Sequence, residues 1–364
     1  MSAKPRFGIM SMALVLVLGA CGGSPTAGTQ APGATAAPGT DTTSAAVGEG
    51  AAQAKLECSN LAYGGDGPAN IAYMPPATEF PYYIAIGEGL KAKAAELGHE
   101  TFMLAPQSGA DIAGQMGMIQ DVLTQDVDAI ILSTHDEQAA APLVKQATDA
   151  GVAVVIVNSD IADFPTPVHG VVGYQQRAGT HKIGDYAIEL VGGEAKVGII
   201  EGLPGYHSTE RIGGFLDAIA DQPGMEVVAS LPGNWNVEGG NQAGRDLLQA
   251  NPEVEMIMTA NDYMSIGANI AAKELGRDDV VILGNDGDTQ ALEEIAAGEW
   301  QATVNTTPYL MGEAVMEVTD GCLKGAFDGF YVETPTVIVD ETNVMEYICQ
   351  PDTLYPPLSK DYDC

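Results

Sequence analysis

The 364-residue sequence predicts an α/β protein made of two lobes, each a parallel sheet flanked by helices. Three observations lead to this prediction. Short apolar segments alternate with segments of helical periodicity, the alternation begins a second time near the middle of the chain, and several apolar segments end in polar residues. The length is sufficient for two domains of ordinary size.

The first lobe is predicted from four strands separated by three helices. The strands are apolar runs bounded by turn residues, and the helices end at a glycine, as at Gly98 and Gly151. The predicted strands cover 69–74, 101–105, 129–133 and 152–157, and the predicted helices cover 82–97, 112–123 and 139–150. Strands joined through helices in this order form a parallel sheet that is covered on both faces.

The second lobe is predicted from a repeat of this pattern after 171–175. Helices are expected at 181–191, 208–220 and 241–250, strands at 196–201 and 226–230, and a strand-helix-strand unit at 254–288. Three later segments, a strand at 301–304, a helix at 312–323 and a strand at 336–339, are too few to form a third domain. They are expected to return and complete the two sheets.

The unit at 254–288 indicates where a ligand binds. Its strands are followed by Asn261-Asp262 and by Asn285-Asp286, and parallel strands joined by one helix finish at the same edge of the sheet. Ligands of open α/β sheets bind at that edge. Carboxylates accept hydroxyl protons and amides both donate and accept, so the pairs suit a polyhydroxylated ligand such as a sugar. The alternative is that these residues only cap helices.

The composition argues against several classes of partner and activity. The net charge of -34, from 49 acidic and 15 basic residues, disfavours binding to nucleic acid and to anionic membrane surfaces. The sequence contains no GxSxG, HExxH or P-loop motif, and no GxGxxG after a strand. A glycosidase that uses Asp262 and Asp286 as acid and base is therefore a remote alternative.

The N-terminus resembles a bacterial lipoprotein signal. Lys4 and Arg6 precede an apolar run at 9–18, and Leu18-Gly19-Ala20-Cys21 is a small-residue cleavage site that ends in cysteine. The resemblance implies a signal peptide at 1–21 and a lipidated Cys21, which holds the protein at the outer face of a membrane, in the periplasm or at the cell surface. The segment 22–57 is rich in small and polar residues and is predicted to be a disordered tether.

The other four cysteines are expected to form disulfides, because their number is even and the compartment is oxidising. They are Cys58, Cys322, Cys349 and Cys364. Three pairings are open, and the sequence does not choose between them. The tail from Cys349 to Cys364 contains several prolines and little periodicity, so we expect a bridge there. Metal ligation is the weaker alternative, because no CxxC pair is present.

Five motifs, in this order, resemble the type I periplasmic binding proteins for sugars. They are Phe80-Pro81-Tyr82-Tyr83, Thr209-Glu210-Arg211-Ile212-Gly213-Gly214-Phe215, Ala260-Asn261-Asp262-Tyr263-Met264-Ser265-Ile266-Gly267-Ala268, Gly284-Asn285-Asp286-Gly287 and Ala302-Thr303-Val304. The resemblance covers about 69–339 and implies two Rossmann-like lobes that close on a ligand. It implies a three-strand hinge near Gly173, Asn305 and Thr334. The implied segments are an N-terminal lobe of 69–173 and 305–333, a C-terminal lobe of 174–304 and 334–342, and a tail of 343–364.

The resemblance also implies ligand-binding roles for individual residues. Tyr82 and Tyr83 match an aromatic pair that stacks on the sugar ring, and Trp235 matches the aromatic residue of the second lobe, since apolar faces of sugars lie well on aromatic rings. Asn261 and Asp286 match the polar pair that binds ring hydroxyls. The remaining expected contacts are Glu79, Asn158, Asp160, Gln175, Thr209, Asn305 and Thr306. For either tyrosine, the alternative is a place in the core. Asp262 is instead interpreted as a cap of its own helix.

The sequence departs from the ribose-binding pattern at three places. The fourth strand ends in Asn158-Ser159-Asp160 where the pattern has Asp-Arg, Thr209 replaces an arginine although Arg211 follows it, and Phe80 replaces an asparagine. The loss of two guanidinium groups removes bidentate donors, so neither ribose nor galactose is carried over as the ligand. The acidic residues Glu79, Asp160 and Asp286 favour an amine-bearing or less hydroxylated ligand.

The sequence therefore predicts a lipid-anchored solute receptor of an ABC importer, monomeric and without a cofactor or a bound metal. It is expected to capture a monosaccharide or related polyol and to present the closed form to a membrane permease. An alternative keeps the fold and makes the partner a chemoreceptor or a sensor kinase. The ligand is then a nucleoside or a furanosyl autoinducer.

Overall fold

The structure is a computed structural model that describes residues 55–65, 67–160 and 164–364. The predicted signal peptide with Cys21 and nearly all of the predicted tether lie outside these residues. The last residues of the tether segment are attached to the fold, because the Leu56 N–H donates to the Val168 carbonyl at 3.1 Å. Within the described residues, no helix combines the length and hydropathy needed to cross a membrane.

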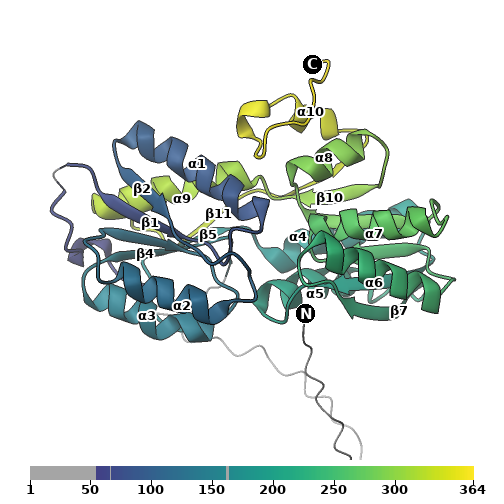
Figure 1. Cartoon of the computed structure of the whole chain (residues 1–364), viewed down its shortest axis with the longest axis horizontal. Helices are drawn as coiled ribbons and strands as arrows, with labels where there is room; N and C mark the ends of the chain where they lie inside the picture. Colours follow the sequence, from purple (N-terminus) through teal and green to yellow (C-terminus); the bar gives the residue numbers. More distant parts are fainter. Residues whose placement is uncertain (1–54, 66, 161–163) are drawn as a thin grey trace, which may run out of the picture. The chain divides into compact units, whose positions relative to one another are not determined.

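The first sheet has six parallel strands in the order β11-β5-β4-β3-β1-β2. Its strands are β1 (Asn70–Met74), β2 (Glu100–Met103), β3 (Ala129–Leu132), β4 (Ala153–Val157), β5 (Gly170–Gly173) and β11 (Tyr331–Glu333). Its helices are α1 (Pro81–Leu97), α2 (Ile112–Val122), α3 (Glu137–Asp149) and α9 (Pro308–Leu323). Figure 1 shows α1 and α9 on one face of this sheet and α2 and α3 on the other. We call this sheet with its helices the first lobe.

The second sheet also has six strands, in the order β12-β10-β9-β8-β6-β7, and only β12 is antiparallel to its neighbour. Its strands are β6 (Ala195–Glu201), β7 (Met225–Pro232), β8 (Met256–Thr259), β9 (Val281–Asp286), β10 (Ala302–Asn305) and β12 (Val337–Asp340). Its helices are α4 (Gln176–Val191), α5 (Tyr206–Ile219), α6 (Val237–Ala250), α7 (Asp262–Glu274) and α8 (Thr289–Ala296). This sheet with its helices is the second lobe, and the predicted α/β class is confirmed.

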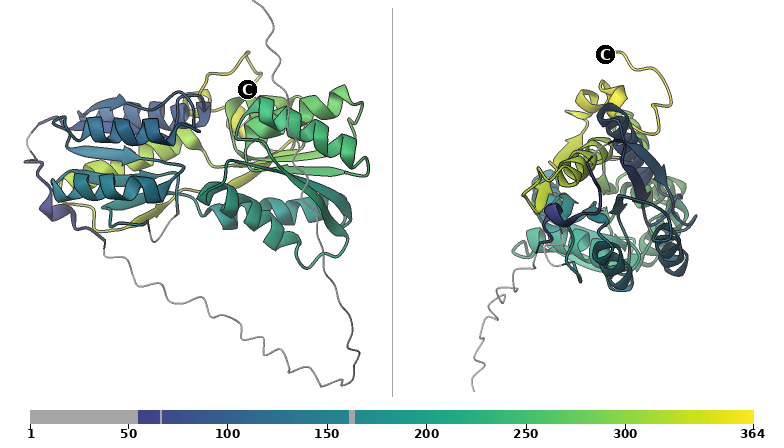
Figure 2. Two further views of the ribbon diagram at one scale, coloured as in Figure 1. Left: turned by 60° about the horizontal axis from the view of Figure 1, so that its bottom comes forward. Right: turned by 90° about the vertical axis from the view of Figure 1, so that its left-hand side faces the viewer.

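The chain passes between the two sheets at three places. It leaves the first sheet after β5, leaves the second after β10 and returns to the second between β11 and β12. Figure 2 shows these connections between the two halves in its left view. Because the connections follow the carboxyl ends of β5, β10 and β11, they run past the sheet edges at which a ligand is expected.

Close helix packing and a disulfide fix the first lobe. A Cβ atom on Gly89 of α1 would lie 1.9 Å from the Tyr309 carbonyl oxygen, and one on Gly312 of α9 would lie 2.0 Å from that of Ile86. Only glycine lets these two helices approach so closely. A disulfide between Cys58 and Cys322 joins the segment before β1 to α9. The chain before the first strand is therefore held to the last helix of the lobe.

The C-terminal tail contains α10 (Val344–Ile348) and is closed by a disulfide between Cys349 and Cys364. The predicted bridge in the tail is thus confirmed, and the other two cysteines, Cys58 and Cys322, form the second disulfide. The tail contacts α8, where the backbone N–H and hydroxyl of Ser359 both donate to Glu293 at 2.8 Å. It is fastened to the second lobe.

The sequence analysis did not identify four of the α-helices and strands. They are β5, β11, α8 and α10. Strand β5 has the sequence GVVG and β11 has three residues, so neither carries enough apolar residues for a pattern to be visible. Both strands are formed through their mutual pairing and through the pairing of β5 with β4. The α4 helix also begins earlier than predicted, at Gln176.

Candidate functional site

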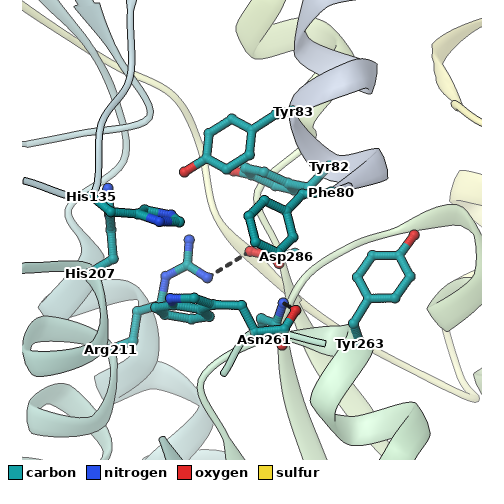
Figure 3. A pocket seen from close by; sticks show the side chains of 10 residues that line it. Phe80, Tyr82, Tyr83, His135, His207, Arg211, Asn261, Tyr263 and Asp286 are labelled. Atoms are coloured by element: carbon teal, nitrogen blue, oxygen red, sulfur yellow. Dashed lines mark hydrogen bonds and ion pairs between the residues drawn. The ribbon is translucent and has the colours of Figure 1, made fainter. Parts of the chain in front are cut away.

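A cavity lies between the two lobes, at the carboxyl ends of strands from both sheets. It contains about 350 Å³ of space free of atoms, which includes solvent at its open side. Ten residues line it: Phe80, Tyr82, Tyr83 and His135 from the first lobe, and His207, Arg211, Trp235, Asn261, Tyr263 and Asp286 from the second. Figure 3 shows these side chains gathered around one space, with an ion pair at its floor. Most of the wall is aromatic.

The start of α1 supplies the aromatic wall of the first lobe. Pro81 occupies the first turn, where its fixed φ and missing N–H suit a helix, and Phe80 is the N-cap residue. Phe80, Tyr82 and Tyr83 are buried, and the rings of Phe80 and Tyr83 lie 6.1 Å apart. The rings of Tyr82 and Tyr83 meet edge to face at 5.4 Å. All three rings are therefore held in place by one another.

Hydrogen bonds behind the wall anchor the two tyrosine hydroxyls. The Tyr82 hydroxyl donates to Asn158 Oδ1 at 3.0 Å and contacts the Thr306 hydroxyl at 2.9 Å. Asn158 Nδ2 donates to the Tyr83 hydroxyl at 3.2 Å. Burial raises the pKa of both tyrosines, so they are neutral in the folded protein. Asn158 and Thr306 thus contact the tyrosines and do not line the cavity.

His135 and Trp235 meet across the cavity from opposite lobes. Their rings are stacked, with centroids 6.3 Å apart and an interplanar angle of 26°. His135 follows β3, and Trp235 follows β7. The Trp235 ring occupies the place where Gly202 lacks a side chain, since a Cβ atom there would lie 2.1 Å from it. The two rings therefore face each other from opposite lobes.

Arg211 and Asp286 form an ion pair 2.8 Å long at the floor of the cavity. Arg211 also donates to the Ala260 carbonyl at 3.0 Å, and its guanidinium group lies 5.5 Å from the Trp235 ring centroid. Burial disfavours the charge of Arg211, but Asp286 raises its pKa above the ordinary value. Burial raises the pKa of Asp286 to about 6, against the opposing effect of Arg211. Both residues are charged at neutral pH, and their opposite charges cancel.

His207 lies beside Arg211 because the two residues are four positions apart on α5. The buried Gln176 connects them: its Nε2 contacts His207 Nδ1 at 2.7 Å, and its Oε1 accepts from Arg211 Nε at 3.2 Å. Burial lowers the pKa of His207 well below the ordinary value, and Arg211 and His135 act in the same direction. Burial likewise lowers the pKa of His135 to about 4. Both imidazoles are neutral at physiological pH.

Asn261 caps α7, since its Oδ1 accepts from the Met264 N–H at 3.0 Å. The interpretation of Asp262 as the cap is wrong. Asp262 is buried behind the cavity, where it accepts from the N–H groups of Gly287 and Asp288 at 2.8 and 3.0 Å. Asn261 still lines the cavity while it caps the helix. The carboxylate of Asp262 instead holds the loop after β9.

Three residues at the site have a positive φ angle although they are not glycine. They are Asn158 at 60°, Trp235 at 66° and Asp286 at 147°. Such conformations are unfavourable for residues with a Cβ atom and occur mostly at functional sites. Trp235 and Asp286 line the cavity, and Asn158 anchors its tyrosines. The backbone is thus strained where it positions these side chains.

Several expected contacts are not part of the cavity wall. Glu79 is exposed and accepts from the Gly109 N–H at 2.7 Å, and Asp160 accepts from the N–H of Gln176 at 2.9 Å. Gln175 precedes α4 and donates to Glu333 at 2.8 Å. Thr209 is exposed, because it lies two residues from both His207 and Arg211 and therefore on the opposite face of α5.

The amide at the second hinge is also directed away from the cavity. Asn305 is buried, and its Oδ1 accepts from the Thr307 N–H at 2.8 Å. Of the three acidic residues expected around the ligand, Glu79, Asp160 and Asp286, only Asp286 is among the residues that line the cavity. Its charge is matched by Arg211.

Five lining residues were not among the expected contacts: Phe80, His135, His207, Arg211 and Tyr263. The spacing of His207 and Arg211 on one helix is the signal that would have placed them together. His135 follows a strand of the first lobe, a position at which ligand contacts are common. In the described residues, no cluster of histidine, cysteine and acidic side chains is arranged to hold a metal ion.

Comparison with known proteins finds relatives of this chain among periplasmic binding proteins. A family model described as "Periplasmic binding protein domain" matches residues 71–326. The ribose import binding protein of Bacillus subtilis is 28% identical over 245 residues, which are 67% of this chain and 78% of that protein. The D-apiose import binding protein of Actinobacillus succinogenes is 28% identical over 244 residues, with 67% and 77% covered.

Solved structures show the same similarity. An ABC transporter periplasmic solute binding protein from Actinobacillus succinogenes with bound D-allose has a TM-score of 0.72 at 25% identity, covering 77% of this chain and 100% of that one. An ABC transporter solute binding protein from Mycobacterium smegmatis with bound glycerol has a TM-score of 0.72 at 26% identity, covering 77% and 96%. Both share the two-lobe architecture described above.

Proposed function

Because the chain belongs to the periplasmic binding protein family, we propose that it is the lipid-anchored receptor of an ABC importer and binds a monosaccharide or related polyol between its lobes. The family and the relatives consist of substrate-binding transport proteins, so the chain is a binding protein and not an enzyme. Its relatives work outside the cytoplasm as parts of sugar importers, which supports the same location and a permease partner.

The observation that carries this proposal is the aromatic cavity that both lobes share. Tyr82 and Tyr83 offer rings from the first lobe and Trp235 offers a ring from the second, while Arg211 and Asp286 offer polar groups between them. Aromatic faces suit the C–H faces of a sugar, and paired charged groups suit its hydroxyls. A ligand in this position contacts both lobes only when they are closed. Its binding energy therefore favours the closed form.

The proposed lobes are 69–173 with 305–333 and 174–304 with 334–342, and opening occurs at the three connections between them. In the closed form, His135 of the first lobe faces Trp235 of the second. Tyr206 of the second lobe also donates a hydrogen bond to Asp160 of the first. These contacts separate when the lobes open. A permease that recognises surfaces of both lobes in this arrangement would distinguish the loaded receptor from the empty one.

A thermal-shift screen of the purified protein tests the proposed ligand class. The panel contains pentoses, hexoses, polyols, amino sugars, nucleosides and furanosyl compounds. A ligand at about a hundredfold above its dissociation constant stabilises the protein by about 2.7 kcal/mol, which raises the melting temperature by a few degrees. We expect a sugar to give this shift without any product appearing. A shift with a nucleoside or furanosyl signal and with no sugar would instead favour a receptor for signalling.

The lipid anchor rests on the sequence at Leu18-Gly19-Ala20-Cys21, outside the described residues. We expect an alkyne-labelled fatty acid to be incorporated when the gene is expressed in a bacterium and the protein to fractionate with membranes. The Cys21→Ala variant should lose the label and keep the fold. A labelled Cys21→Ala protein would show that the lipid is attached elsewhere.

A further inference from the structure

We propose that Gln176 is a positioning residue for ligand binding: its amide group fixes the orientation of Arg211 and the tautomer of His207, and ties both side chains to the first lobe. The inference rests on the proposed function, because it concerns residues of the same cavity, and it assigns a role to a residue outside the cavity wall. Gln176 is the first residue of α4, which follows the first connection between the lobes, and it is completely buried.

The amide of Gln176 contacts three groups. Its Oε1 accepts from Arg211 Nε at 3.2 Å, and its Nε2 contacts His207 Nδ1 at 2.7 Å. Nε2 also donates to the Asn158 backbone carbonyl at 3.2 Å. An amide nitrogen carries two donor hydrogens, so both contacts of Nε2 are made at once. Gln176 therefore joins the first lobe, through Asn158, to two residues of the second-lobe wall.

The orientation of this amide follows from its partners. Arginine donates hydrogen bonds and accepts none, so the atom that contacts Arg211 Nε must be the amide oxygen. The Asn158 backbone carbonyl accepts and cannot donate, so the atom that contacts it must be the amide nitrogen. Two independent partners thus give the same assignment. It places the amide nitrogen of Gln176 against His207.

The tautomer of His207 is a consequence of that orientation. The nitrogen of Gln176 can only donate, so His207 Nδ1 accepts and carries no proton. Burial and the nearby charge of Arg211 lower the pKa of His207, which keeps the ring neutral, with its proton on Nε2. The ring also hydrogen-bonds the backbone of Thr134 in the first lobe. Because Nδ1 is an acceptor, Nε2–H is the donor of this bond between the lobes.

Gln176 also helps to decide which atoms of Arg211 face the ligand. Nε is bound to Gln176, while Nη1 donates to the Ala260 carbonyl at 3.0 Å and to Asp286 at 2.8 Å. No group in the described part of the chain accepts from Nη2. Figure 3 shows the guanidinium group projecting among the aromatic rings of the cavity. Since this group is planar and rigid, bonds that hold Nε and Nη1 leave Nη2 directed at the ligand.

Asn158 connects this network to the first-lobe wall. Its side chain holds the hydroxyls of Tyr82 and Tyr83, and its backbone carbonyl holds Gln176. Two buried amides therefore link the tyrosines of one wall to the polar side chains of the other. A rotation of the lobes at the first connection moves Gln176 relative to Asn158 and so reaches the second-lobe wall. The orientation of that wall is thereby coupled to the angle between the lobes.

Nitrogen NMR of the purified protein with labelled histidine tests the tautomer without any ligand. The chain contains five histidines, and the His207→Asn variant identifies the His207 signals by their absence. We expect wild-type His207 at neutral pH to show an unprotonated Nδ1 and a protonated Nε2. The nearly isosteric Gln176→Glu variant keeps the acceptor for Arg211 but lacks the donor for His207. Its Nδ1 signal should therefore shift to that of a protonated nitrogen.

The control is Gln146→Glu, the same change at an exposed position of α3, which should keep the wild-type spectrum. A proton on Nδ1 of wild-type His207, or an unchanged tautomer in Gln176→Glu, would overturn the inference. Thermal melting of each variant checks its folding. The wild-type spectrum decides the assignment of the tautomer even if a variant does not fold.

Calorimetric titration with the pentoses, hexoses and polyols of the thermal-shift panel tests the effect on binding. Gln176→Leu removes every bond of the amide and should bind any sugar that the wild-type protein binds about 10 to 100 times more weakly, because a buried charged donor loses its partner. Gln176→Glu should lose less, since it keeps the bond to Arg211. Equal affinity of Gln176→Leu and the wild-type protein would contradict the positioning role. If no sugar binds the wild-type protein, the proposed function is overturned, while the histidine spectra still decide the role of Gln176.

Discussion

Arg211 and Asp286 face each other at 2.8 Å with side chains that are only 5% and 3% exposed, one from a helix of the second lobe and the other from the end of β9. Removing two charges from water is costly, and their attraction offsets this cost only when the geometry is good and further hydrogen bonds are made. The raised pKa of Asp286, about 6, shows that burial outweighs the attraction of Arg211. We therefore interpret this ion pair as part of the binding site and not as a source of stability.

We expect the Arg211→Met variant to lose about 3 to 5 kcal/mol of unfolding free energy at neutral pH, because it leaves the buried Asp286 carboxylate without its partner. The double variant Arg211→Met/Asp286→Leu should lose less than the single variant. Urea unfolding of both variants and of Asp286→Leu measures the coupling. Costs of the single variants that simply add in the double variant would show that the pair contributes nothing as a pair.

Trp235 should report ligand binding through its fluorescence. The sequence contains two tryptophans, and Trp235 lines the cavity while Trp300 is buried elsewhere and donates to Glu294 at 2.9 Å. The Trp235→Ala variant should bind about 10 to 100 times more weakly and lose the ligand-dependent signal. The Trp300→Phe variant should keep both. Unchanged affinity in Trp235→Ala would mean that this ring does not contact the ligand.

His135 should make the stability of the closed protein sensitive to acid. Its pKa is about 4 in the folded protein against about 6.5 when exposed, so its contribution is complete above about pH 6.5 and is lost as the pH falls toward 4. The raised pKa values of Asp286 and Asp262, about 6 and about 7, act in the opposite direction. The effect of His135 is therefore best measured as a difference between variants.

Between about pH 7 and pH 4.5, the wild-type protein should lose about 2 kcal/mol more unfolding free energy than the His135→Gln variant. Urea unfolding at the two pH values gives this difference. The control is His181→Gln, which changes an exposed residue of α4 and should follow the wild-type protein. Parallel losses in the wild-type protein and in His135→Gln would indicate that the imidazole is already exposed in the folded state.

The two disulfides should contribute unequally to stability. The Cys58–Cys322 bridge spans 264 residues and the Cys349–Cys364 bridge spans 15, so chain entropy predicts about 5.5 kcal/mol for the first and about 3 kcal/mol for the second. Paired serine variants of each bridge, compared by denaturant unfolding, measure the two contributions. A larger loss from the tail bridge would show that constraint of the unfolded chain is not the main effect.

The order of elements and the edge that carries the site follow from local patterns. Apolar strands followed by amphipathic helices predict parallel sheets, and polar residues after the strands predict a site at their carboxyl ends. Tyr82, Tyr83, Trp235, Asn261 and Asp286 were expected at the site and do line the cavity. They share one property: each lies at the end of a strand, in the loop that follows it or at the start of the next helix. Chain direction alone carries such residues to the same edge.

The direction of individual side chains was decided by the tertiary structure. Thr209 and Arg211 are two residues apart and therefore lie on opposite faces of α5. The packing of this helix exposes Thr209 and buries Arg211 beside Asp286. Glu79 and Asp160 accept hydrogen bonds from backbone N–H groups of other segments. His135 became part of the cavity only because the opposite lobe brings Trp235 against it. A sequence determines which residues reach a sheet edge, but contacts between segments far apart in the chain determine which of them face the ligand.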